Sequence, residues 1–148
     1  MITIAVIVFM SLTAIAIFHA AWGCGVRWPA QDERDLVALV IGATGRTRMP
    51  PPLECWAAAA AIFAAGLVAL AVSNVVFVSL PPSLVTLAGL GVTAVFALRG
   101  IAAYLPAWRR HFSQEPFATM DRSWYGPLCL LFALAFAMLI VKRIAETT

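Results

Sequence analysis

The chain has 148 residues, of which 63% are hydrophobic and only 11% are charged, and its formal net charge is +3. Soluble domains carry about 25% charged residues, so a soluble fold of this length could not bury so many apolar side chains. The composition excludes an ordinary soluble domain and predicts one integral membrane domain over residues 1–148. Because the basic residues form no dense run, we expect no nucleic-acid binding.

The first predicted element is a membrane span over residues 2–22, in which His19 is the one strongly polar residue. About 20 apolar residues cross the hydrocarbon core of a bilayer. The run lacks the basic residues with which a signal peptide begins, and it is longer than the apolar region of a signal peptide. We therefore expect a retained first helix.

A long first loop follows over residues 23–52. Its middle stretch, "LVALVIG", is too short to cross a bilayer and is expected to form a short strand or a segment lying at the interface. The later stretch "GATGRT" lacks the four-residue spacing between glycines and the lysine of a phosphate loop, so nucleotide binding is not expected.

Three further spans are predicted, over residues 53–80, 83–105 and 123–145. Pro81 and Pro82 separate the first two of these, and the sequence "SLPPSL" predicts a tight turn between antiparallel helices. The last span is expected to begin at Ser123 as its N-cap, which puts Pro127 in or just after the first helical turn. The predicted fold is therefore an all-α bundle of four transmembrane helices.

The distribution of basic residues predicts the orientation. With four spans the first and third loops share one side of the membrane, and Lys142 and Arg143 follow the last span on the other side. The positive-inside rule then places the loops in the cytoplasm and both termini outside a bacterial inner membrane. The basic loop residues are Arg27, Arg34, Arg46, Arg48, Arg109, Arg110 and Arg122.

Four ionisable residues come together on this topology, because the spans alternate in direction. His19, Glu54, Arg99 and Asp121 all fall near the cytoplasmic face and are the candidate catalytic residues. Arg99 is expected either to reach toward lipid headgroups or to form a salt bridge with Glu54 or Asp121, since an unpaired arginine in lipid is costly.

Every tryptophan and tyrosine falls at the same face, whereas an aromatic belt normally marks both interfaces. The aromatic residues are therefore expected to line a pocket around the polar groups. The candidate ligand-binding residues are Trp22, Trp28, Trp56, Tyr104, Trp124 and Tyr125, and Trp108 lies nearby.

No metal site is expected, because Cys24, Cys55 and Cys129 form no CxxC pair. A haem bridged by His19 and His111 has little support, and the cofactor is left open.

Four segments resemble a bacterial family of small four-helix membrane proteins with a domain of unknown function. These are "FHAAWGCGVRWP", "MPPPLECWAAAAAIFAAGL", "ALRGIAAYL" and "FATMDRSWYGPLCLL". The most specific parts are the HxxW segment with its following Trp-Pro and the segment from Phe117 through Asp121 and Tyr125 to Cys129. Gly126 stands where a serine is expected. The resemblance implies four spans and no particular activity.

Three functions remain open. The preferred one is a binding or accessory membrane protein whose polar cluster is structural. The first alternative is an enzyme acting on a lipid, quinone or other apolar molecule, with His19 or Glu54 as general acid or base and Arg99 holding a charge. The second is a transporter or channel formed by an oligomer, for which Ser11, Thr13, Thr86 and Thr93 are weak candidates.

The expected partners are membrane lipids and an apolar small molecule, with a homo-oligomer or a larger membrane complex as further options. An open cavity lined by the four polar groups would favour the enzyme, and tight pairing without a cavity would favour the structural cluster.

Overall fold

The computed structural model describes residues 1–147. In that range the helices are joined by loops and there is no strand, which confirms the all-α prediction. Four helices are long and apolar enough to span a membrane, as expected of a multi-pass membrane protein. The first three are α1 (Ile2–Gly23), α3 (Pro52–Val72) and α4 (Pro82–Ala102).

The fourth long helix is composite. It runs through α6 (Phe117–Met120), a π turn η1 (Asp121–Tyr125) and α7 (Gly126–Thr147). Two short helices, α2 (Glu33–Val40) and α5 (Pro106–His111), lie in the connections.

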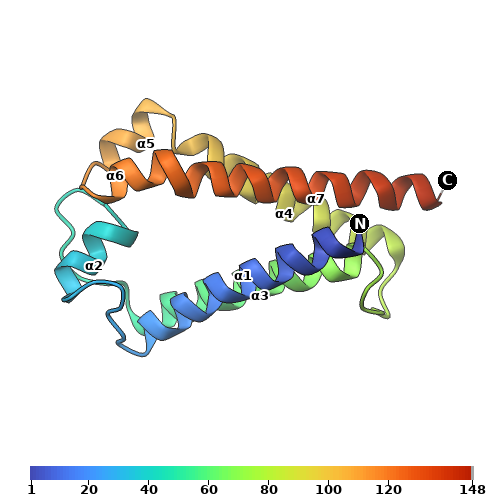
Figure 1. Ribbon diagram of the computed structural model, residues 1–148, viewed down its shortest axis with the longest axis horizontal. Helices are drawn as coiled ribbons and strands as arrows, with labels where there is room; N and C mark the ends of the chain where they lie inside the picture. Colours follow the sequence, from blue (N-terminus) through green and yellow to red (C-terminus); the bar gives the residue numbers. More distant parts are fainter. Residues whose placement is uncertain (148) are drawn as a thin grey trace.

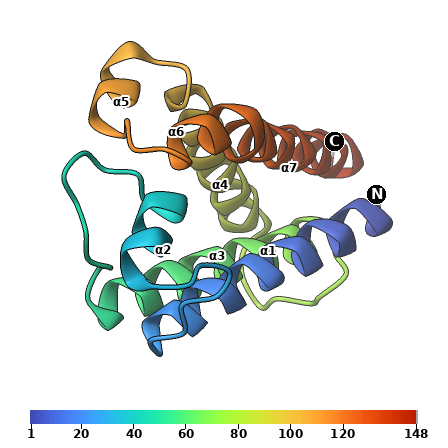
Figure 2. The same ribbon diagram turned by 60° about the vertical axis from the view of Figure 1, so that its left-hand side comes forward.

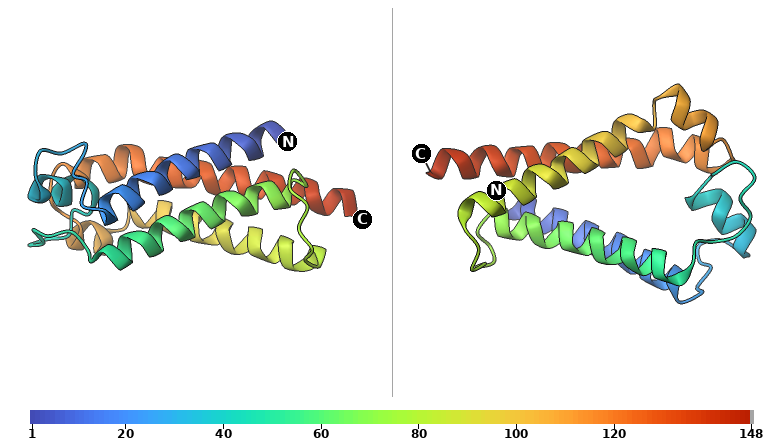
Figure 3. Two further views of the ribbon diagram at one scale, coloured as in Figure 1. Left: turned by 90° about the horizontal axis from the view of Figure 1, so that it is seen from below. Right: turned by 180° about the vertical axis from the view of Figure 1, so that it is seen from behind.

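The long helices form two antiparallel pairs, α1 with α3 and α4 with α7 (Figure 1). The pairs approach each other at the end that holds both chain termini and diverge toward the other end (Figures 1 and 3). We call these the closed end and the open end. Helices α2, α5 and α6 all lie at the open end, and α2 lies between the two pairs there (Figure 2).

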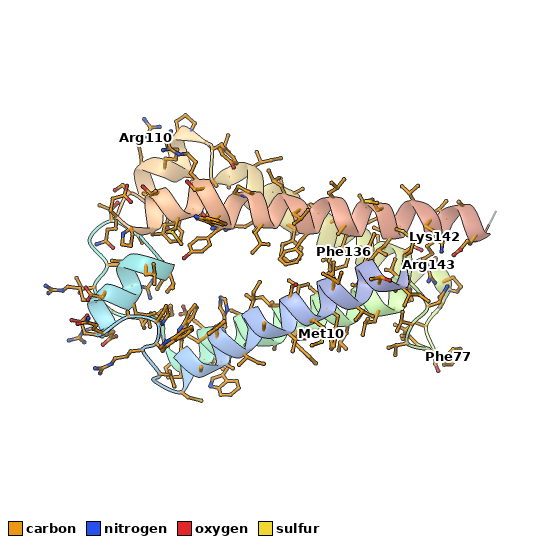
Figure 4. All side chains as sticks on the ribbon, in the orientation of Figure 1. Met10, Phe77, Arg110, Phe136, Lys142 and Arg143 are labelled. Carbon is orange, nitrogen blue, oxygen red and sulfur yellow. The ribbon has the colours of Figure 1, made fainter. Side chains whose placement is uncertain are left out.

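The apolar core lies where the pairs meet, nearer the closed end. Phe136 of α7 is fully buried and points toward the other pair (Figure 4). Side chains on the outer faces remain exposed, such as Met10 at 60%, because lipid takes the place of a covering protein layer. The buried cluster comprises Ala5, Val8, Leu12, Ala69, Leu70, Val72, Val85, Phe132, Phe136, Leu139 and Ile140.

Small residues let α1 and α3 approach each other. Ala59, Gly66 and Ala69 of α3 are buried, and a Cβ added at Gly66 would lie 3.1 Å from the Phe9 ring of α1. Close helix packing in lipid relies on such residues. Ala57, Ala60 and other alanines of the same run are exposed, so the alanine-rich sequence serves packing on one face only.

The second span ends earlier than predicted, and the expected tight Pro-Pro turn is wrong. Helix α3 stops at Val72 rather than Leu80, and residues 73–81 form a non-helical loop. Asn74 ends the helix in the left-handed region (φ 55°), which asparagine tolerates better than most residues. Hydrophobicity alone could not reveal this, because the loop remains apolar; Phe77 is 91% exposed on it (Figure 4).

Arg143 of α7 joins the two pairs at the closed end. Its Nη1 donates to the backbone carbonyl oxygens of Ala71 (3.3 Å) and Val72 (3.1 Å) and to Oδ1 of Asn74 (3.0 Å). A cation at the carboxyl end of α3 satisfies carbonyls that have no helical partner and interacts favourably with the helix dipole. Figure 4 shows this side chain beside the 73–81 loop.

The middle of the first loop is α2, so the strand alternative is wrong. Asp32 caps the helix, because its Oδ1 accepts a hydrogen bond from the backbone N–H of Asp35 at 2.8 Å. Leu36 and Val37 are buried while Arg34 and Asp35 are exposed, as in an amphipathic helix. Glu33 is partly buried and accepts a hydrogen bond from the backbone N–H of Met49 at 2.9 Å.

The fourth helix begins at Phe117, not at Ser123, which lies inside the π turn. Pro127 explains the turn, because proline has no N–H to give to the carbonyl four residues earlier and its ring crowds that carbonyl. The backbone instead widens, and the N–H of Gly126 bonds to the carbonyl of Asp121, five residues back.

We expect Gly100→Ala to destabilise the α4/α7 pair by about 1–3 kcal/mol through overpacking. A Cβ at Gly100 would lie 2.7 Å from the Leu130 side chain and 3.0 Å from the Gly126 carbonyl oxygen. Thermal unfolding in detergent, followed by circular dichroism, measures the change.

The matched control is Gly91→Ala on the same helix, where a Cβ meets nothing within 4 Å. That variant should be as stable as the parent or more so, because alanine favours helix by about 0.5–1 kcal/mol over glycine. Equal effects at both positions would contradict the close approach of α4 and α7.

Candidate functional site

A partly buried ion pair joins α4 to the π turn near the open end. Nη2 of Arg99 lies 2.5 Å from Oδ1 of Asp121. Nε1 of Trp108 donates to the other carboxylate oxygen, Oδ2, at 2.9 Å. The guanidinium carbon of Arg99 also lies 4.8 Å from the centre of the Trp108 ring, a cation–π distance. We call these three residues the Arg–Asp–Trp lock.

The lock uses both oxygens of a carboxylate that is almost completely buried, since the Asp121 side chain is 4% exposed. A carboxylate in such surroundings is stable only when it is paired and hydrogen-bonded. Of the two partners foreseen for Arg99, the structure selects Asp121. Glu54 is exposed in the first turn of α3 and does not join the pair.

Two glycines allow the lock to form. Gly100 and Gly126 are buried neighbours of Arg99 and the π turn, and a Cβ at Gly126 would lie 2.8 Å from the Cβ of Ala103. Any larger side chain would push α4 and α7 apart at this level.

A cavity of about 440 Å³ lies between the two helix pairs on the inner side of the lock. Its wall is mainly apolar and aromatic, and Arg99 and His19 are the charged or titratable nitrogen-bearing groups on it. Both helix pairs contribute, and α2 supplies Val40 at the open end. The lining residues are Leu12, Ile15, Phe18, His19, Trp22, Val40, Ile62, Val95, Phe96, Arg99, Phe117, Tyr125, Leu128, Cys129 and Phe132.

His19 has a defined hydrogen-bonding state. Its Nδ1 lies 2.9 Å from the backbone carbonyl oxygen of Ile15, one turn earlier on α1. Because a carbonyl only accepts, Nδ1 carries the proton, and in the neutral ring Nε2 is an acceptor. Arg99 contributes a hydrogen-bond donor, because its Nη1 is buried and has no hydrogen-bond partner among the described residues.

The first loop is attached to the second helix pair at the open end of the cavity. The Tyr125 hydroxyl donates to the Leu39 carbonyl (3.4 Å), and the Thr44 backbone N–H donates to the His111 carbonyl (3.0 Å). Gly42, at φ +66°, lies against Phe117, where a Cβ would come within 2.2 Å of the ring. These contacts hold α2 across the diverging ends of the helix pairs.

A second hollow, of about 450 Å³, lies on the outer side of the lock over α5 and α6. Arg109, Arg110 and Arg122 line it together with Glu115, so we call it the basic hollow. Trp108 and Asp121 line it too, whereas Arg99 lines the cavity. The lock therefore stands between the basic hollow on the outer surface and an apolar interior.

The structure brings some of the sequence candidates together and separates others. Two of the four ionisable candidates, His19 and Arg99, line the cavity. Asp121 does not line it but forms the ion pair with Arg99. Two of the six aromatic candidates, Trp22 and Tyr125, also line it. The other four are exposed around the open end, as in an interfacial belt: Trp28, Trp56, Tyr104 and Trp124.

Several cavity residues were not singled out from the sequence. Phe96 and Phe132 lie in unbroken apolar runs, where nothing distinguishes a cavity-lining ring from a lipid-facing one. Trp108 was recognised as near the face but not as a partner of Asp121. His111, the second histidine of the haem hypothesis, is exposed and lies outside the cavity lining.

The comparisons with known proteins give a family but no activity. The model of the family described as "Protein of unknown function (DUF3995)" matches residues 12–136. No match is found among the curated proteins or among the solved structures.

We expect Arg99→Ala to cost about 3–5 kcal/mol of stability, because it leaves the buried Asp121 carboxylate without its cation. Arg99→Lys should recover only part of this loss, since an ammonium group lacks the planar fork of the guanidinium. The measurement is chemical or thermal unfolding in detergent.

The double variant Arg99→Met with Asp121→Leu is the control. Replacing both charges with apolar side chains should restore most of the stability. If Arg99→Ala alone is neutral, the arginine merely extends toward headgroups and the lock is not structural.

Proposed function

This chain belongs to the family "Protein of unknown function (DUF3995)", and we propose that it is an integral membrane protein that binds an apolar small molecule between its helix pairs. The single observation that carries the proposal is the mainly apolar cavity with Arg99 and His19 on its wall. Pockets of about 300–1,000 Å³ with an apolar wall and few polar groups are typical of small-molecule sites.

The ligand would enter from the bilayer. Phe18, Val95 and Leu128 line the cavity and are 38%, 65% and 39% exposed, so the cavity is not enclosed at these residues of α1, α4 and α7. We infer that it opens to lipid between the helix pairs. Toward water the cavity is covered by α2 and the residues that hold it, which favours a lateral route.

Binding is better supported than catalysis or transport. An enzyme of the foreseen kind would have all four ionisable candidates around one open cavity, whereas His19 and Arg99 line the cavity and Glu54 lies away from it. A transport route needs free polar groups along the path. The hydroxyls of Thr86 and Thr93 instead donate to carbonyls one turn back on their own helix, at 3.0 and 2.8 Å. Of the candidate hydroxyls, that of Thr13 is buried without a partner among the described residues, and one such group does not make a path.

The orientation we propose puts the open end in the cytoplasm and both termini outside a bacterial inner membrane. Seven arginines lie in the segments at the open end. At the closed end Arg143 is buried against α3 carbonyls, and Lys142 pairs with Glu146 at 3.3 Å. The positive-inside rule favours a cytoplasmic open end. Because Lys142 and Arg143 are engaged in contacts at the closed end, this preference is stronger than the number of basic residues at each end alone would suggest.

Cysteine labelling of intact cells tests this orientation. In a Cys24→Ser background, Phe77→Cys in the exposed 73–81 loop should react with a membrane-impermeant maleimide added outside. The parent Cys24, exposed at the open end, should react only after the cells are opened. The reverse pattern would overturn the orientation and leave the cavity in place.

Titration with the apolar fluorophore N-phenyl-1-naphthylamine tests binding itself. The parent protein should bind the dye saturably, and Cys129→Trp, which puts an indole into the cavity wall, should weaken binding at least tenfold. Leu131→Trp is the matched control, because Leu131 lies on the same helix, is 60% exposed and does not line the cavity.

Thermal unfolding of each variant shows whether the substitution leaves the protein folded. No saturable dye binding to the folded parent protein, or equal loss in both tryptophan variants, would contradict a binding cavity.

A further inference from the structure

The polar end of the cavity restricts the charge of its ligand. Arg99 carries one positive charge and Asp121 one negative charge, and both carboxylate oxygens are occupied. A carboxylate or phosphate entering the cavity would place a second anion on a guanidinium that is already neutralised. In a low-dielectric site this leaves a buried net negative charge, which is strongly unfavourable.

Anionic groups also have a better place to bind. The basic hollow offers Arg109, Arg110 and Arg122, with Glu115 as the one carboxylate besides Asp121, and it opens on the outer side of the lock. A charged headgroup is therefore drawn to that hollow, and the cavity is left for a neutral molecule.

The two nitrogen groups on the cavity wall specify complementary hydrogen bonds. Nη1 of Arg99 is a buried donor without a partner among the described residues, so an oxygen acceptor that reaches it through a small movement of the wall would satisfy it. Nε2 of the neutral His19 ring is an acceptor, because Nδ1–H is directed to the Ile15 carbonyl, so it fits a hydroxyl donor. A molecule with hydroxyl groups can satisfy both, whereas one with carbonyl groups alone leaves His19 unsatisfied.

The rest of the wall favours an aromatic ring over a simple chain. Rings from both helix pairs surround the space, including Phe18 and Trp22 of α1, Phe96 of α4 and Phe132 of α7. Phe96 and Phe132 already pack with their ring centres 5.3 Å apart, within the range of favourable aromatic contacts. A further ring could join them, and its apolar chain would leave between the pairs toward lipid.

We propose that the cavity binds an electrically neutral hydroxylated aromatic ring with an apolar chain, which is the chemistry of a membrane quinol. The hydroxyl oxygen accepts from Arg99 Nη1, and a hydroxyl hydrogen is donated to His19 Nε2. This inference rests on the proposed binding function and adds the class of ligand to it.

The test is displacement of N-phenyl-1-naphthylamine from the full chain in detergent by four compounds that share a ten-carbon tail. They are a decyl benzoquinol kept reduced under anaerobic conditions, the corresponding benzoquinone, decanol and decanoate. The quinol should displace the dye at a concentration at least tenfold lower than decanoate. It should also act at a several-fold lower concentration than the quinone, which lacks the hydroxyl donor, and than decanol, which lacks the ring.

Two histidine variants connect this preference to the site. His19→Phe removes the acceptor and should reduce the ratio of quinol to quinone affinity about three- to tenfold, the effect of one hydrogen bond. His111→Phe, an exposed histidine outside the cavity, should leave the ratio unchanged. If His19→Phe does not fold, the relative affinities of the four compounds for the parent protein still test whether the cavity prefers a quinol.

The outcomes separate the two proposals. Saturable dye binding with decanoate or decanol equal to the quinol would overturn the quinol inference and leave the binding function standing. Equal affinity for quinol and quinone would overturn the assigned role of His19. If the folded parent protein binds no dye, both proposals are wrong.

Discussion

The fold depends on keeping charges stable in an apolar environment. Asp121 is buried at the start of the π turn of the fourth long helix, and an unpaired carboxylate there would be very costly. Arg99 and Trp108 together satisfy both of its oxygens, which fixes α4, the segment after it and the π turn relative to one another. The position of the cavity follows from this, because the lock forms its polar boundary.

The two ends of the molecule use arginine in different ways. At the closed end Arg143 has the backbone carbonyls of the α3 terminus as its partners, which draws the two helix pairs together. At the open end Arg99 has a carboxylate from its own helix pair, so it does not bridge to the other pair. The pairs can therefore diverge there, and α2 spans the space with its buried Leu36 and Val37 (Figure 2).

The cavity wall combines aromatic rings with two polar side chains, Arg99 and His19. The charge of Arg99 is balanced by Asp121, so the site presents hydrogen bonds without net charge. The basic hollow on the other side of the lock has the opposite character, with three arginines on its wall.

The sequence by itself determined the class of fold and the four apolar helices, because the length of apolar runs is a local property. It left open whether Arg99 extends toward lipid headgroups or pairs with Glu54 or Asp121, because that choice depends on residues far apart in the chain. It also placed His19 and Arg99 near one face. It could not tell that α3 ends at Val72, since an apolar loop and an apolar helix have the same composition. Nor could it separate Trp22 and Tyr125, which line the cavity, from Trp124, which is exposed. Only the tertiary structure decided these points. Which residues line the cavity depends on the distance between the two helix pairs. It also depends on the π turn, which shifts the helical register by one residue.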